Sequence, residues 1–303
     1  MYRKRRFILR SSRKQHVLRR RTGAGKRAWL CFLAPSLLGV LVFVCLPFLD
    51  VVRRSFTTAV TGRWTGFSNY RSVFENEAFR LAVWNTFRFT AVCLPLLVGL
   101  GLFVAVQLSK LSNNQRFKTM FLFPMAVPAA AVVLVWKMVF SSGGFLNLFL
   151  NRMGILADGV QPDYMASGSA FWVLVFSYVW KNLGYTVVLW LAGLSAVPDS
   201  ILEAARVDGA SQWKCFWRIT LPNLKGSLYT ITVLSFLNSF KVFREAYLVA
   251  GSYPDKSMYL LQHLFNNWFV NLDLDKMAAA AVCVGMVLFM AILLLQRLWD
   301  RED

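Results

Sequence analysis

The chain is organised around residues 203–222, EAARVDGASQWKCFWRITLP, a polar segment set between long apolar runs. Ser200 can serve as an N-cap with Glu203 three positions on, so a capping box predicts a short helix here. Gly209 permits the positive φ that ends such a helix. The segment therefore predicts a helix, a glycine turn and a second helical piece.

The second piece carries an aromatic face. Trp213, Phe216 and Trp217 follow i, i+3, i+4 spacing, and Pro222 is expected to close the helix. Two short helices joined at a glycine, lying on a membrane surface with an aromatic face outward, suit a groove on a soluble partner.

The composition indicates a membrane protein. Of 303 residues, 57% are hydrophobic and only 16% are charged, with a mean hydropathy of +0.48. This apolar excess predicts a lipid-facing surface. Much of the net charge of +19 lies in residues 1–27, directly before an apolar run. We interpret that block as a basic cytoplasmic tail that obeys the positive-inside rule, and we expect no nucleic acid as a partner.

Catalytic and metal chemistry find no support in the sequence. The five cysteines have neither metal-ligand nor redox spacing, and the two histidines, His16 and His263, lie at opposite ends of the chain. A complete Walker A motif is absent, so this chain is not expected to hydrolyse ATP. We predict that the protein is not an enzyme, binds no metal and holds no cofactor of its own.

The hydropathy pattern predicts an all-α, polytopic protein with six transmembrane helices in a domain of residues 28–303. An even number of crossings places both termini and the loop of residues 196–222 on one face, which the basic tail marks as cytoplasmic. The predicted spans are 29–49, 82–108, 121–140, 169–194, 227–250 and 277–295.

Polar residues within the fourth and fifth spans are candidates for contact with a transported solute. Tyr178, Asn182 and Tyr185 share one helical face. Asn238, Lys241 (or Val242) and Glu245 share another. Aromatic rings beside amides suit a sugar, which offers apolar ring faces and many hydroxyls. The alternative is that these side chains only hydrogen-bond across a helix bundle. The same spans also hold Lys181, Arg244 and Glu245.

The organising segment resembles the cytoplasmic loop signature of the membrane subunits of ABC importers. Every fixed position is filled: Glu203, Ala204, Ala205, Gly209, Ile219, Leu221 and Pro222. Gly66–Tyr70, Asn85-Thr86 and Asp208–Ser211 resemble the carbohydrate-importing, maltose-type branch. The resemblance runs from about Trp29 to the C-terminus. It departs at Val249–Pro254, where a Thr-x-Gly-Gly-Pro turn is usual in the family.

This resemblance implies a cell-membrane permease that works in an assembly with a second permease subunit, two ATP-hydrolysing subunits and an extracellular solute-binding protein. The ATPase-coupling residues would be Glu203, Ala204, Ala205, Asp208, Gly209, Trp213 and Phe216. Glu203 could also act only as a helix cap. A sugar or oligosaccharide path would comprise Tyr178, Asn182, Tyr185, Asn238, Ser239 and Val242.

Two alternatives stay open at this point. An importer for amino acids or peptides would share the loop signature. A secondary transporter would more often carry internal repeats and membrane-embedded acids, whereas Glu245 is the only acid well inside a predicted span.

Overall fold

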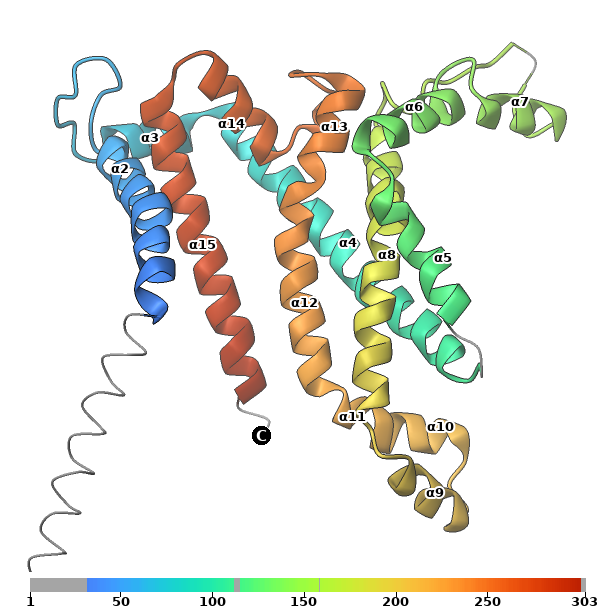
Figure 1. The fold of residues 1–303 in the computed structure, drawn as a ribbon. Helices are drawn as coiled ribbons and strands as arrows, with labels where there is room; N and C mark the ends of the chain where they lie inside the picture. The colour runs from blue at the N-terminus through green and yellow to red at the C-terminus, as the bar shows by residue number, and fades with distance from the viewer. Residues whose placement is uncertain (1–31, 112–114, 158, 301–303) are drawn as a thin grey trace, which may run out of the picture.

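The computed structural model describes residues 32–111, 115–157 and 159–300 (Figure 1). These residues are predominantly helical and form no strand, apart from one isolated bridge between Thr57 and Trp64. The prediction of an all-α chain is confirmed for them. The predicted basic tail, residues 1–27, lies outside the described residues.

The first helix, Phe32–Ser55, runs past the predicted end at residue 49. It contains a π-helical turn, η1 (Leu41–Cys45), and finishes in α2 (Leu46–Ser55). Asp50 accepts hydrogen bonds from Arg53 at 2.9 Å and Arg54 at 2.6 Å, and such i+3 and i+4 ion pairs favour helix over loop. The sequence analysis wrongly placed these residues in a loop.

The longest helix is α4 (Glu77–Ser109), which follows α3 (Ser68–Glu75). It begins where the Asn76 side chain accepts a hydrogen bond from the Phe79 backbone, at 3.0 Å. From there α4 crosses diagonally behind α12 and α8 (Figure 1). It therefore forms the back wall on which the central helices pack.

Two predicted spans, 121–140 and 227–250, are broken helices. The first divides into α5 (Gln115–Ala126) and α6 (Ala129–Phe140), because Pro128 has no N–H to donate and disfavours helical backbone at Val127. The second divides into three elements: α12 (Lys225–Ser239), the 3₁₀ turn η3 (Phe240–Val242) and α13 (Phe243–Ala250).

The fourth and sixth predicted spans are confirmed as helices, α8 (Ala170–Ser195) and α15 (Leu274–Asp300). Shorter elements connect the long ones. They are α7 (Phe145–Arg152), α9 (Asp199–Val207), α10 (Gln212–Cys215), η2 (Phe216–Thr220), α11 (Leu221–Asn223), η4 (Lys256–Met258) and α14 (Leu261–Val270).

Within the described ranges, four helical segments are long and apolar enough to cross a membrane: Phe32–Ser55, Glu77–Ser109, Ala129–Arg152 and Leu274–Arg297. A fifth is α8 counted together with α9, which bends away from it by 67°. The structure thus supports four to five crossings on length and composition, whereas α12 alone has only 15 residues.

Glycines bring the central helices into close contact. A Cβ at Gly184 of α8 would collide with the backbone carbonyl of Phe121 in α5. A Cβ at Gly101 of α4 would lie 2.6 Å from Cγ2 of Thr186 in α8. Small residues permit this approach where helices lack a hydrophobic driving force within lipid. Trp190 is fully buried at the same interface and donates to the Val98 carbonyl at 3.1 Å.

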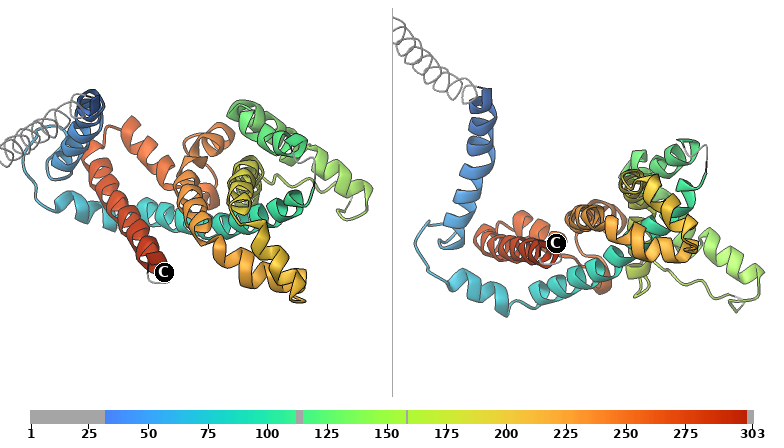
Figure 2. Two further views of the ribbon diagram at one scale, coloured as in Figure 1. Left: turned by 60° about the horizontal axis from the view of Figure 1, so that its bottom comes forward. Right: turned by 90° about the horizontal axis from the view of Figure 1, so that it is seen from below.

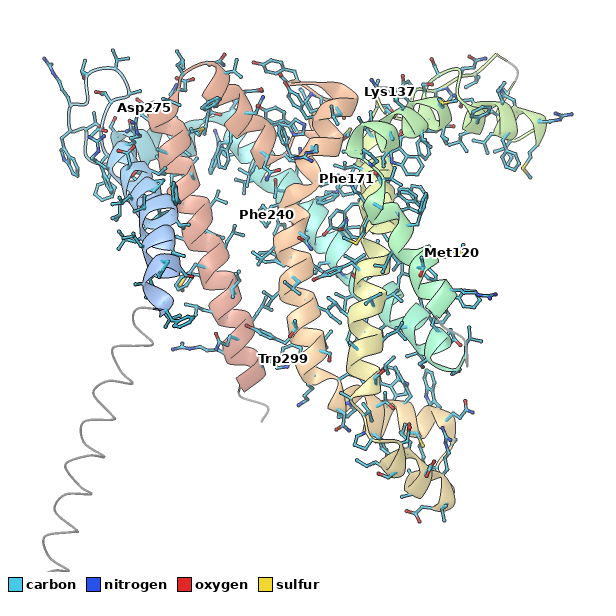
Figure 3. All side chains as sticks on the ribbon, in the orientation of Figure 1. Met120, Lys137, Phe171, Phe240, Asp275 and Trp299 are labelled. Atoms are coloured by element: carbon cyan, nitrogen blue, oxygen red, sulfur yellow. The ribbon has the colours of Figure 1, made fainter. Side chains whose placement is uncertain are left out.

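The bundle is open and leaves much apolar surface uncovered (Figures 2 and 3). The first helix stands beside α15 at one edge, and most of its large apolar side chains are exposed, including Phe43 at 80%. Met120, at the opposite edge in Figure 3, is 72% exposed. Surfaces of this extent are suited to lipid or to another chain.

The two ends of the bundle differ. α9, α10, the start of the first helix and the end of α15 lie toward one end, here called the α9 end (Figure 1). α3, α7 and α14 lie at the other, the α14 end. Side chains from the family-like segments hold the α14 end together: Asn85 donates to the carbonyls of Lys256 and Tyr259 at 2.6 and 3.0 Å, and Thr86 accepts from Leu261 at 3.0 Å.

Candidate functional site

The segment that opened the sequence analysis forms a helical hairpin at the α9 end. Gly209 adopts φ +80° between α9 and α10, as predicted. The Ser211 hydroxyl caps α10 by accepting from the Lys214 backbone at 3.3 Å. Only glycine takes this φ without steric cost, so the turn depends on the residue that the sequence singled out.

Two local predictions for the hairpin were wrong. α9 begins at Asp199 after Pro198 and has no side-chain cap, so neither Ser200 nor Glu203 caps it. Pro222 does not end the second helix. Just before Pro222 lies η2, a π-helical turn in which hydrogen bonds join residues five apart instead of four. Helical structure then continues through the proline to Asn223. η1 precedes Pro47 at the same spacing.

Most of the predicted coupling residues face solvent. Glu203, Ala204, Asp208 and Gly209 are exposed, whereas Ala205 and Phe216 are half-buried. Trp213 is 71% exposed and lies edge-on to Trp217, with ring centroids 5.6 Å apart. Exposed tryptophans outside the apolar bundle are characteristic of the anchors of a protein interface.

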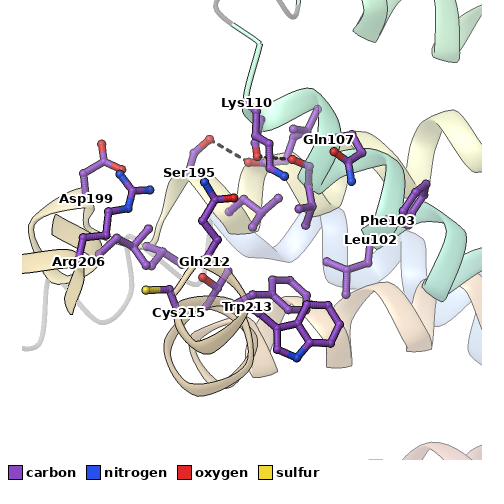
Figure 4. A pocket seen from close by; sticks show the side chains of 18 of the residues that line it. Leu102, Phe103, Gln107, Lys110, Ser195, Asp199, Arg206, Gln212, Trp213 and Cys215 are labelled. Atoms are coloured by element: carbon purple, nitrogen blue, oxygen red, sulfur yellow. Dashed lines mark hydrogen bonds between the residues drawn. The ribbon is translucent and has the colours of Figure 1, made fainter. Parts of the chain in front are cut away.

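A cavity of about 910 Å³ separates the hairpin from the bundle (Figure 4). Leu102, Phe103, Gln107 and Lys110 of α4 line one side, and Arg206, Gln212 and Trp213 line the other. The hairpin therefore contacts the bundle through its base, where Leu224 is fully buried, and leaves its tip free. The hairpin thus projects from the bundle and does not fill a space within it.

A second cavity, of about 690 Å³ and here called the central cavity, lies where the broken helices meet. Four of the six predicted path residues line it: Tyr178, Asn182, Asn238 and Val242. Four helices and the break between α5 and α6 contribute its walls. The described lining residues are Met125, Ala126, Val127, Pro128, Ala129, Ser177, Tyr178, Lys181, Asn182, Asn238, Val242, Phe243, Arg244 and Gln262.

Hydrogen bonds fix part of this wall. The Tyr178 hydroxyl donates to the Ser235 carbonyl at 3.0 Å and joins α8 to α12. The Asn182 amide donates to the Tyr178 carbonyl at 2.8 Å. That bond uses one N–H of Asn182, and its amide oxygen takes no part in it. The wall thus offers a positioned amide beside a fixed aromatic ring.

The other two predicted path residues do not line the cavity. Ser239 is 4% exposed, makes a 3.2 Å hydrogen bond with Thr90 of α4 and donates to the Phe236 carbonyl at 2.7 Å. It therefore joins helices, which is the alternative that the sequence analysis left open. Tyr185 is half-buried two turns beyond Tyr178.

Sequence reasoning missed several residues near this site. Gln262 arrives from α14, and Met125–Ala129 line the cavity only because the helix breaks at Pro128. Pro128 was a local signal for that break, whereas no local signal placed Gln262 at the cavity. Arg88 in α4 was also missed, although a charge within a predicted span was signal enough. Its guanidinium lies 4.2 Å from the ring centroid of Phe171.

A third cavity, of about 560 Å³, opens at the α14 end. Lys137, Asp163, Tyr253 and Asp255 line it, beside the segment where the sequence departs from the family pattern. Hydrogen bonds from the Ser257 hydroxyl and backbone, at 2.6 and 2.9 Å, lower the pKa of Asp255. The described residues contain no group of three or more His, Cys, Asp or Glu placed to hold a metal ion.

Residues 97–302 match the family described as the binding-protein-dependent transport system inner membrane component. The chain belongs to this family. Its loop signature and helical hairpin are thus those of an inner membrane component, and the resemblance to ABC importer permeases is confirmed. Several of its helices are apolar enough to cross that membrane.

Individual relatives agree with the family. This inner membrane component is 30% identical to the probable ABC transporter permease protein YesP of Bacillus subtilis, covering 86% of this chain and 87% of that one. It is 30% identical to the sulfoquinovosyl glycerol transport system permease protein SmoG of Agrobacterium fabrum, over 82% and 83%. These relatives are transport permeases.

A solved structure shows the same fold. A bacterial ABC transporter involved in the import of the acidic polysaccharide alginate superposes with a TM-score of 0.79 at 20% identity. The superposition covers 93% of this inner membrane component and 99% of the solved chain. The overall fold of this chain is therefore already known from a transporter.

Proposed function

We propose that this chain is a permease subunit of an ATP-driven, binding-protein-dependent sugar importer. The observation that carries the proposal is the geometry of α8. Tyr178 and Asn182 of this helix line the cavity of about 690 Å³, and its last residue, Ser195, lies four positions before the hairpin begins at Asp199. One rigid element thus connects a solute-sized cavity with an exposed docking surface.

The hairpin is the proposed contact with an ATPase subunit. Gly209 shapes its tip, and Glu203, Ala204, Ala205, Asp208, Trp213 and Phe216 form the surface around it. Closure of two ATPase subunits would push this hairpin and its counterpart on a second permease together. Because α8 runs unbroken from the cavity to Ser195, four positions before the hairpin, that movement would switch the path between its inward-facing and outward-facing states.

The proposed topology has six crossings, with α5–α6 and α12–α13 as broken spans. The α9 end, which holds the hairpin and the end of α15, would be cytoplasmic. The α14 end would then receive an extracellular solute-binding protein. An open bundle with exposed apolar faces fits a chain that forms half of the path and pairs with a second permease.

A sugar is the proposed cargo. The cavity combines Tyr178 with the amides of Asn182, Asn238 and Gln262, a pairing that suits ring faces and hydroxyls. SmoG is named for the transport of sulfoquinovosyl glycerol, and the solved transporter is named for the import of the polysaccharide alginate. Both names support a saccharide over an amino acid or a peptide.

Co-purification with candidate ATPase and permease subunits from the same genome tests the proposal. Gly209→Val places a β-branched residue at φ +80° and should distort the hairpin tip, at a cost of about 1–2 kcal/mol in backbone strain. We expect the ATPase recovered per permease to fall by about 10-fold. Gly209→Asn should retain most of it, because asparagine tolerates positive φ.

Gly62→Val is the matched control. Gly62 has φ +63° in a loop at the α14 end, so the substitution imposes similar strain far from the hairpin. ATPase recovery should equal that of the wild type. If Gly209→Val and Gly62→Val bind equally well, the hairpin is not the coupling element. If even the wild type retains no ATPase, the proposed coupling to an ATPase subunit is overturned.

A further inference from the structure

The central cavity carries positive charge at the depth of the broken helices. Lys181 of α8 and Arg244 of α13 both line it, and none of its described lining residues is a carboxylate. Charged side chains within membrane-spanning segments are costly and are kept for a ligand or a partner. A path for neutral sugars requires hydroxyl-binding groups but no cations.

Arg244 is the informative residue. It is exposed, and no ion pair joins it to a carboxylate within the part of the chain that the structure describes. Arginine presents a planar fork of N–H donors that matches carboxylate, sulfonate and phosphate oxygens. Lys181 approaches from the facing helix, so an anion between α8 and α13 would meet both cations.

The break between α5 and α6 adds a third positive element. Pro128 and Ala129 line the cavity, and Ala129 is the first residue of the 12-residue α6. The unpaired N–H groups at a helix N-terminus favour negative charge. Broken helices in transporters use this arrangement for anionic groups of their cargo.

The neighbouring sequence leaves the balance positive. Residues 241–245 contain Lys241, Arg244 and one acid, Glu245. Together with Lys181 that makes three cations against one carboxylate. Even if Lys241 and Glu245, which are four positions apart, neutralise each other, Lys181 and Arg244 leave the balance positive.

We infer that this path is built for an anionic saccharide, a sugar that carries a carboxylate, sulfonate or phosphate, with Arg244 as the principal anion-binding residue. The inference rests on the proposed function and specifies its substrate class. The amides of Asn182, Asn238 and Gln262 would bind the hydroxyls, while Arg244 and Lys181 select the charge.

The assembled importer, reconstituted with its own binding protein, tests this inference. The probes are trigalacturonate and a sugar phosphate as anions, and maltotriose as a neutral saccharide of similar size. We expect ATP-driven uptake of at least one anionic probe and at least about 10-fold less uptake of maltotriose. Arg244→Gln should lower anion uptake by about 10-fold or more, and Arg244→Lys should restore part of it.

Arg297→Gln is the matched control. Arg297 is exposed in the last turn of α15, away from both the cavity and the α14 end (Figure 1), so uptake should equal that of the wild type. Uptake of maltotriose at the anion's rate, unchanged by Arg244→Gln, overturns the anionic specificity and leaves the sugar importer intact. ATP-driven uptake of an amino acid or a peptide, with none of the saccharides, overturns the proposed function as well.

Discussion

The hairpin at the α9 end and the wall of the central cavity are specified in opposite ways. The hairpin depends on residues close in sequence: Gly209 sets its turn and Ser211 caps its second helix. The cavity wall joins α5, α6, α8, α12, α13 and α14, which span residues 115 to 270. One region is held by local chemistry and the other by contacts between distant helices.

This difference has a mechanical meaning. A hairpin with its own turn and cap can keep its shape while it moves as a rigid unit. In the proposed mechanism, a wall made from broken helices would open and close where its α-helices are interrupted, at Val127 and at the 3₁₀ turn η3. Substitutions should therefore cost most at the long-range contacts of the wall and least within the hairpin.

The largest effect is expected at Gly184. Gly184→Ala would force a Cβ into the backbone carbonyl of Phe121, and neither helix can yield without opening the contact between α5 and α8. Overpacking of this kind costs about 3 kcal/mol, well above the gain of about 1 kcal/mol from the better helix former. Thermal unfolding of the purified permease in detergent should show a clearly lower midpoint.

Gly226→Ala provides the comparison. Gly226 is the second residue of α12, and a Cβ there would meet no atom within 4 Å. The same replacement should leave the midpoint unchanged or raise it slightly. Equal behaviour of the two variants would show that α5 does not pack on α8 as closely as the structure indicates.

The extent of sequence-based prediction follows the same division. The loop signature predicted the position of the hairpin, and the positive φ of Gly209 followed from glycine alone. The amphipathic spacing placed Tyr178 and Asn182 on one wall. The helix breaks escaped prediction because a hydropathy window averages over Pro128 and over η3. Gln262 escaped because only tertiary contacts bring α14 to the cavity.

The caps at the hairpin mark another limit. Ser200 and Glu203 fit a capping box, yet the N-cap of α9 is Pro198, two residues earlier, and neither side chain is used. Pro198 already fixes the entry of the chain, since its φ of −65° is compatible with a helix start and it has no N–H to satisfy. Pattern alone could not decide between two overlapping start signals.

An intermediate effect is expected from acidification at the α14 end. His263 of α14 is fully buried, and burial lowers its pKa to about 4. Above pH 6.5 the ring is neutral in the folded and unfolded states, so its full contribution is present. As the pH falls from 6.5 to 4, only the unfolded state takes up the proton, and stability is lost. The loss at pH 5 is about 2 kcal/mol.

Thermal unfolding at pH 7 and pH 5 measures this loss, with His263→Asn as the reference. Asparagine can still accept the hydrogen bond that the Leu260 backbone gives to Nδ1 of His263, but it does not titrate. The difference between the two pH values should shrink in the variant. Asp255 does not interfere, because its lowered pKa confines its own loss of stability to pH below about 4. An equal shift in both proteins would place the titration elsewhere.

The smallest effect is expected at Ser211, within the hairpin. Ser211→Ala removes the hydroxyl that accepts from the Lys214 backbone, and loss of an N-cap costs about 1 kcal/mol. Because the hairpin tip packs little against the bundle, the unfolding midpoint of the whole permease should not change. Hydrogen exchange of the α10 amides should instead rise by about 5-fold, while exchange in α8 stays constant. A lower midpoint for the whole protein would mean that the hairpin unfolds together with the bundle core. The hairpin would then not be a separate unit that moves the cavity wall, as proposed.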